Sequence, residues 1–106
     1  HAEINAIRKA CQARKDLYLS DCTMYVTLEP CLMCFAAIVN SRVKKLIYGL
    51  PSPKYGAFSS NYSTPQNVER LFLSTEIYGG FYQSEISNIM KKFFEVKRKR
   101  FNGNRY

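Results

Sequence analysis

Four residues in two short segments have the types and spacing of a metal-dependent hydrolytic site. Cys31 and Cys34 form a C-x-x-C pair directly after Pro30, and His1 lies two residues before Glu3. Residues i and i+3 of a helix lie on one face, so both thiols would point the same way. One histidine and two thiolates provide three zinc ligands and leave a fourth position for water, which is typical of catalytic zinc sites.

Glu3 lies beside this ligand set without being needed in it. A carboxylate there can take a proton from an activated water and pass it to a leaving group. A C-x-x-C pair alone also fits a redox pair, and a lone histidine is often an ordinary polar residue. The combination of the chain's single histidine, a nearby glutamate and a cysteine pair after a proline favours the catalytic zinc interpretation.

The pattern of apolar residues predicts the elements that must hold these side chains. Helices are expected over residues 3–14, 31–40 and 83 to about 100, and strands over residues 24–28, 45–49 and 75–78. Residues 51–65 are rich in Pro, Gly, Ser and Asn and predict a long loop. Strands that alternate with helices predict a layered α/β fold. Cys11 and Cys22 have no partner spacing and are predicted to be small buried hydrophobic residues.

The composition predicts one small domain with an anionic partner. The 106 residues fit one domain at most, and 46% hydrophobic residues argue against disorder. No apolar run is long enough for a membrane span and no leader is visible, so we expect a cytoplasmic location. The net charge is +8, and residues 91–106 hold seven basic residues against one acid. This cluster predicts contact with nucleic acid first and an anionic membrane second, or simply a solvated end.

Four segments resemble the cytidine deaminase-like superfamily, and within it the bacterial tRNA-specific adenosine deaminases. They are HAEINAI at residues 1–7, YVTLEPCLMC at 25–34, SRV at 41–43 and KYGA at 54–57. The resemblance implies a three-layer α/β/α fold around a five-stranded sheet, and a homodimer without membrane attachment. It implies one Zn²⁺ per chain, held by His1, Cys31 and Cys34.

The same resemblance implies hydrolytic deamination of the wobble adenosine in the tRNA anticodon arm to inosine, with Glu3 as the catalytic proton carrier. Substrate-binding residues are then expected in three places: the backbone at the end of the second motif, the 54–57 loop and the closing helix. These residues are Glu29, Pro30, Lys54, Phe93 and Arg98. The chain departs from the family at Ser52, where the family often has an aspartate.

The resemblance also implies an opening helix and two strands before His1. We therefore expect residues 1–106 to be a single, N-terminally incomplete deaminase domain that folds poorly and has little activity alone. One alternative is a deaminase for a free base or nucleotide, such as guanine or deoxycytidylate. Another is a non-catalytic zinc module that binds nucleic acid, which predicts a fourth ligand; Cys22 is the only candidate for it.

Overall fold

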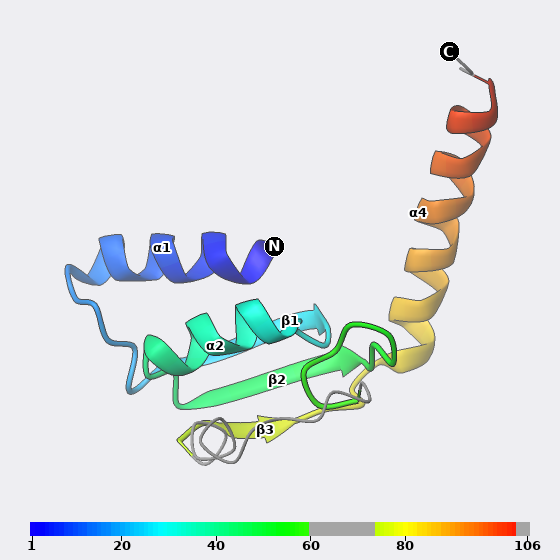
Figure 1. Ribbon diagram of the computed structural model, residues 1–106. Helices are drawn as coiled ribbons and strands as arrows, with labels where there is room; N and C mark the ends of the chain where they lie inside the picture. Colours follow the sequence, from blue (N-terminus) through cyan, green and yellow to red (C-terminus); the bar gives the residue numbers. More distant parts are fainter. Residues whose placement is uncertain (60–73, 104–106) are drawn as a thin grey trace.

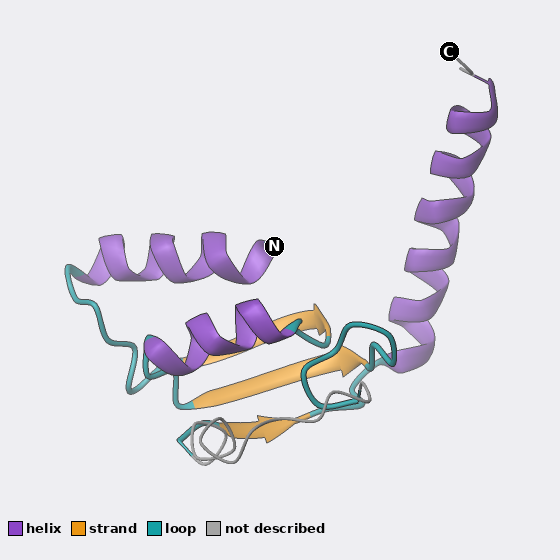
Figure 2. Ribbon diagram, viewed as in Figure 1, coloured by secondary structure: helices purple, strands orange, loops and turns teal. Residues whose placement is uncertain are grey.

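The computed structural model describes the backbone of residues 1–59 and 74–103, with side chains up to Arg98. The predicted helices and strands are all present, with bounds that differ from the prediction by one to three residues. The elements, shown in Figures 1 and 2, are α1 (Ala2–Arg14), β1 (Thr23–Leu28), α2 (Leu32–Asn40), β2 (Lys45–Leu50), β3 (Glu76–Tyr78) and α4 (Gln83–Gly103). The part of the predicted 51–65 loop beyond residue 59 lies outside the described residues.

The three strands form one parallel sheet in the order β1-β2-β3. Parallel neighbours need a crossover connection, and α2 supplies it between β1 and β2. Because all three strands run the same way, their carboxyl ends meet at one edge of the sheet, where β1 leads directly into α2 (Figure 1). The predicted α/β class is confirmed.

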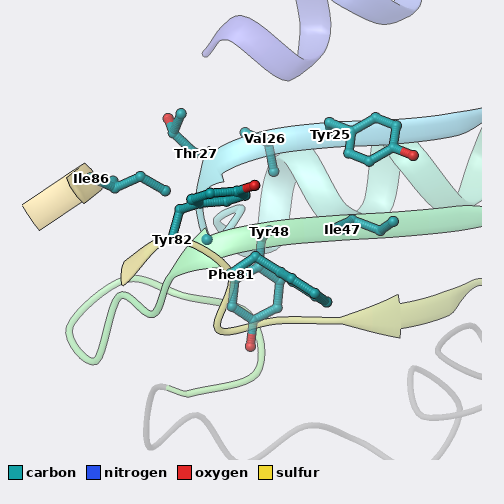
Figure 3. Close-up of a pocket in the computed structure, with 9 residues that line it drawn as sticks. Tyr25, Val26, Thr27, Ile47, Tyr48, Phe81, Tyr82 and Ile86 are labelled. Atoms are coloured by element: carbon teal, nitrogen blue, oxygen red, sulfur yellow. The ribbon is translucent and has the colours of Figure 1, made fainter. Parts of the chain in front are cut away.

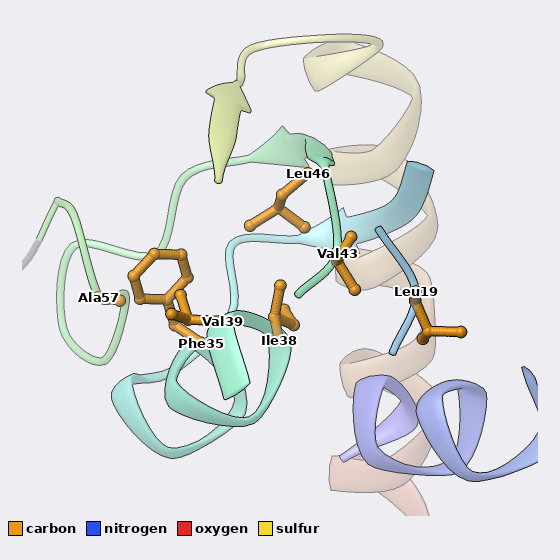
Figure 4. Packing of buried hydrophobic residues seen from close by; sticks show 7 residues of the cluster. All are labelled: Leu19, Phe35, Ile38, Val39, Val43, Leu46 and Ala57. Atoms are coloured by element: carbon orange, nitrogen blue, oxygen red, sulfur yellow. The ribbon is translucent and has the colours of Figure 1, made fainter. Parts of the chain in front are cut away.

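One face of the sheet carries the hydrophobic core. Phe35, Ile38 and Val39 of α2 pack with Leu46 of β2 and with Val43 (Figure 4). The α1 helix rests against this cluster through partly buried side chains, which include Ile7, Ala10 and Cys11. Full burial of each large apolar side chain contributes about 1.5–3 kcal/mol to folding. The core therefore fixes α2 on the sheet and α1 beside α2.

Cys11 and Cys22 are less buried than the sequence predicted. Both are partly buried at the margin of the core. The Cys11 thiol donates to the Leu17 carbonyl at 3.8 Å, and the Arg14 guanidinium donates to the Cys22 sulfur at 2.8 Å. A sulfur atom is a weak hydrogen-bond partner, so a position at the edge of the core lets each cysteine pack and still meet a polar group.

The opposite face of the sheet is more open. Side chains of β1 and β2 and the start of α4 surround a hollow of about 350 Å³ (Figure 3). A Cβ atom at Gly49 would collide with the Ile86 side chain, so glycine is required where α4 touches β2. Beyond this contact α4 projects away from the sheet (Figure 1). None of the described helices is long and apolar enough to cross a bilayer.

Removal of the Phe35 side chain tests the core. This ring is buried and meets Phe58 edge-to-face at 4.7 Å between centroids. In the gene product that carries this sequence, Phe35→Ala is expected to lower the free energy of unfolding by about 3–5 kcal/mol. Urea denaturation measures the change. The control Leu17→Ala, at a side chain that is 76% exposed, should change it by less than about 1 kcal/mol; equal losses would contradict this core.

Candidate metal centre

The structure brings the three predicted metal ligands together. The Nδ1 atom of His1 lies 3.3 Å from the Cys34 sulfur and 3.8 Å from the Cys31 sulfur. All three ligand atoms lie within 4.8 Å of one another, although His1 is 30 residues or more from the cysteines in sequence. The burial is graded, because Cys34 is buried, Cys31 is partly buried and His1 is exposed. One side of the cluster therefore remains open to solvent.

Two helix N-termini bring these ligands to one point. His1 is the N-cap of α1 and Cys31 is the N-cap of α2, while Cys34 lies in the first turn of α2. The two helices lie side by side and run the same way, so both begin near the carboxyl end of β1 (Figure 1). Neither N-cap side chain makes a capping hydrogen bond to its own helix, so neither is committed to that role. Each helix N-terminus also favours negative charge, here thiolate sulfurs.

The donor set fits zinc. Zinc–sulfur bonds of about 2.3 Å and zinc–nitrogen bonds of about 2.0 Å in a tetrahedron place nitrogen and sulfur about 3.5 Å apart. The two nitrogen–sulfur distances, 3.3 and 3.8 Å, lie on either side of this value. Within the described part of the chain, the group consists of these three residues. Cys22, the candidate fourth ligand of a closed site, instead bonds to Arg14.

Glu3 lies near the buried ligand of this cluster, and its predicted catalytic role stays a prediction. The pKa of the Cys34 thiol is raised to about 12, mainly by burial and then by hydrogen bonds with Glu3 and Cys31. The Glu3 carboxylate is therefore among the groups that act on this buried ligand sulfur. A metal cation reverses this pKa shift, because a thiol that coordinates a metal is deprotonated. The arrangement holds a carboxylate beside a three-ligand site with an open side.

Glu29 has a role that the sequence reasoning missed. Its buried carboxylate accepts hydrogen bonds from the backbone N–H groups of Ser52, Phe58 and Ser59, at 3.0, 2.7 and 2.9 Å. Burial alone would raise the pKa of Glu29, but bonds from these three residues lower it below its usual value. The Ser52 contact uses the backbone, so the departure from the family aspartate there leaves it intact.

The Glu29 bonds hold residues 52–59 against the metal ligands. The Ala57 N–H donates to the Pro30 carbonyl at 2.9 Å, and Gly56 forms an antiparallel β-bridge with Cys31. A Cβ atom at Gly56 would collide with the Glu29 carboxylate, so only glycine allows this approach. The signal available in the sequence was an acidic residue at the end of a predicted buried strand. The substrate contacts expected of Glu29 and Pro30 stay predictions.

The other predicted contact residues lie in two regions. Lys54 is exposed on the loop that Glu29 holds, close to the metal ligands in the chain fold. Phe93 and Arg98 lie on the projecting helix α4, where Lys97 covers the Phe93 ring at 5.2 Å and Arg98 donates to the Phe94 carbonyl at 3.4 Å. The structure places Lys54 two residues before Gly56, which pairs with Cys31, whereas Phe93 and Arg98 lie on the projecting helix.

Comparisons with known proteins agree with this geometry. Residues 1–98 match the MafB19-like deaminase family. The chain is 46% identical over 98 residues to a tRNA-specific adenosine deaminase of Rickettsia bellii. The matched region covers 92% of this chain and 67% of the relative. It is 38% identical over 100 residues to the Bacillus subtilis protein of the same name, at 94% and 62% coverage.

A solved structure described under A-to-I editing by tRNA:A34 deaminases at the wobble position of transfer RNA has a similar fold. Its TM-score is 0.70 and its identity 40%, with 84% of this chain and 64% of that chain covered. The chain spans about two thirds of the length of the curated relatives it matches.

The stability that Glu29 supplies should depend on pH. Its pKa is lowered on folding from a usual value of 4.5, so the folded state is stabilised by the ionised form. This contribution is fully present above about pH 5.5 and is lost as the pH falls through 4.5 toward the lower folded pKa. Glu29→Gln should lower the free energy of unfolding by about 2–3 kcal/mol at pH 7 and by much less at pH 3. Urea denaturation at several pH values measures this difference.

The matched control for the pH experiment is Glu76→Gln. This exposed carboxylate forms a surface ion pair with Lys45 at 3.9 Å, so its loss should cost less than about 1 kcal/mol. A Glu29→Gln effect that is independent of pH, or no larger than that of the control, would contradict the anchoring role.

Proposed function

Because the chain belongs to the MafB19-like deaminase family, we propose that residues 1–106 form a single zinc-dependent domain that deaminates adenosine to inosine at the wobble position of tRNA. The observation that carries this proposal is the open three-ligand cluster, with Glu3 beside its buried sulfur. A structural zinc site is normally closed by four protein ligands, whereas a site with three leaves room for a reacting water.

The substrate class is supported by the relatives and by charge. The relatives described above are named tRNA-specific adenosine deaminases, and the similar solved structure concerns tRNA:A34 deaminases. The net charge of +8 favours a polyanion over a free base. Specific RNA recognition favours unpaired loops whose bases can be turned out into a pocket, and an anticodon arm offers such a loop. We further propose a cytoplasmic homodimer, and a monomeric mass in light scattering would contradict it.

In the proposed hydrolysis, the metal ion and Glu3 have separate roles. Zinc, when bound at this cluster, supplies the polarisation that makes water a nucleophile toward carbon 6 of adenine. Glu3 accepts the proton that the attacking water loses and delivers it to the departing amino nitrogen. The overall reaction consumes one water and releases one ammonia as adenosine becomes inosine. The loop that Glu29 holds is paired with the backbone of Cys31 through Gly56.

The metal content tests the ligand assignment. The purified gene product is expected to contain one zinc ion per chain by elemental analysis. Cys34→Ala should lose most of this zinc, because two protein ligands hold the ion too weakly. Cys22→Ala removes a thiol outside the cluster and should keep the full content. A Cys34→Ala protein that retains one zinc per chain would show that the ligand set is wrong.

The role of Glu3 is tested by separating metal binding from turnover. Glu3→Gln keeps the size of the side chain but removes its ability to carry a proton. We expect zinc content and RNA affinity close to wild type, with inosine formation on an anticodon stem-loop reduced at least about 100-fold. Undiminished inosine formation would exclude Glu3 as the proton carrier. Turnover of free guanine, adenine or deoxycytidylate by the wild type, with none on RNA, would replace tRNA as the substrate.

A further inference from the structure

Three exposed apolar side chains belong to the two segments that meet at the Cys31–Gly56 bridge. Leu32 and Met33 lie between the two cysteine ligands and are 37% and 55% exposed. Tyr55, on the loop held by Glu29, is 59% exposed. None of the three belongs to the core cluster. Apolar side chains that stay exposed around a polar centre are candidates for contact with a ligand that has both polar and apolar surfaces.

The backbone around Tyr55 is held close to the metal ligands. Gly56, the next residue, forms the β-bridge with Cys31, and its N–H donates to the Ser52 carbonyl at 2.7 Å. Gly56 is also buried against the Glu29 carboxylate. The position of Tyr55 in the chain is therefore set by bonds on the residues that flank it, while its ring remains exposed. A ligand that stacks on this ring would need little reorganisation of the loop.

Tyr55 is presented together with a positive charge. The ammonium group of Lys54 lies 5.3 Å from the centroid of the Tyr55 ring, which is a cation–π distance. An aromatic face beside a cation matches a nucleotide, whose base can stack on the ring while its phosphate meets the ammonium group. Stacking of unpaired bases on aromatic side chains is a common means of single-stranded RNA recognition.

We propose that the Tyr55 ring stacks on a nucleobase next to the reacting adenosine, and that Lys54 contacts the phosphate of that flanking nucleotide. The inference rests on the proposed function, because it requires an RNA substrate at the metal centre. It assigns Tyr55 as a specificity-determining residue that binds the neighbour of the target base and takes no part in the proton transfers.

The test couples a protein substitution to an RNA substitution. Anticodon stem-loops are prepared with an abasic nucleotide at the position 5′ or 3′ of the target adenosine. We expect Tyr55→Ala to raise KM for the intact RNA about tenfold or more with kcat nearly unchanged, and Tyr55→Phe to behave like wild type. An abasic site at the stacked position should weaken binding to wild type but not to Tyr55→Ala. The same abasic penalty in both proteins at both positions would overturn the proposal.

Two further variants separate stacking from general effects. Tyr25→Ala removes an aromatic side chain that is 75% exposed on β1, and it should leave KM and the abasic penalty at wild-type values. Tyr55→Leu keeps an apolar side chain without a ring and should show most of the Tyr55→Ala loss. Zinc content and melting temperature, measured for every variant, identify any protein that has not folded.

Failure of stacking and failure of the proposed function give different results. Inosine formation by wild type, with no coupling between Tyr55 and either flanking base, overturns the stacking contact alone. RNA binding with clear coupling but without inosine formation supports the contact and overturns the proposed reaction. Absence of RNA binding by a zinc-loaded wild type overturns both.

Discussion

The buried carboxylate of Glu29 is the interaction on which the candidate site depends. A charge removed from water is strongly unfavourable unless hydrogen bonds replace its hydration. Here three backbone N–H groups of residues 52–59 do so. The N–H groups depend on the carboxylate in turn, because without it they would have no hydrogen-bond acceptor. The bonds therefore join an irregular loop to the β1–α2 junction, and that junction carries two of the three metal ligands.

The hydrophobic core determines where the third ligand lies. The α2 helix is fixed on the sheet by Phe35, Ile38 and Val39, and α1 packs beside it. Because both helices begin at the same end of the sheet, their positive dipole ends point toward one region (Figure 1). Burial and the neighbouring Glu3 carboxylate nevertheless raise the pKa of the Cys34 thiol, so a bound metal cation is needed to hold its sulfur as a thiolate. The packing of one face of the sheet and the chemistry at its edge thus have a common origin.

Local patterns in the sequence were sufficient to predict the helices, the strands and the three side chains that the structure groups together. Apolar periodicity gave α1 and α2, and the C-x-x-C spacing placed Cys31 and Cys34 on one helix face. The Glu29 contacts could not be predicted, because their donors are backbone groups, which every residue except proline carries. The direction that α4 takes relative to the sheet could not be predicted from the sequence either. Its apolar stripe was visible, but Phe93 and Phe94 remain half-exposed, since a stripe does not specify which surface it meets.

The exposure of Leu32 and Met33 follows from the spacing of the ligands. Cys31 and Cys34 must face inward to share a metal with His1, and the residues one and two positions after Cys31 lie elsewhere on the helix circumference. Leu32 and Met33 are therefore directed away from the core by the same geometry that forms the metal centre. Their side chains contribute little to the packed interior. Like Tyr55, which precedes the glycine paired with Cys31, they are exposed apolar side chains that are available for contact with a ligand.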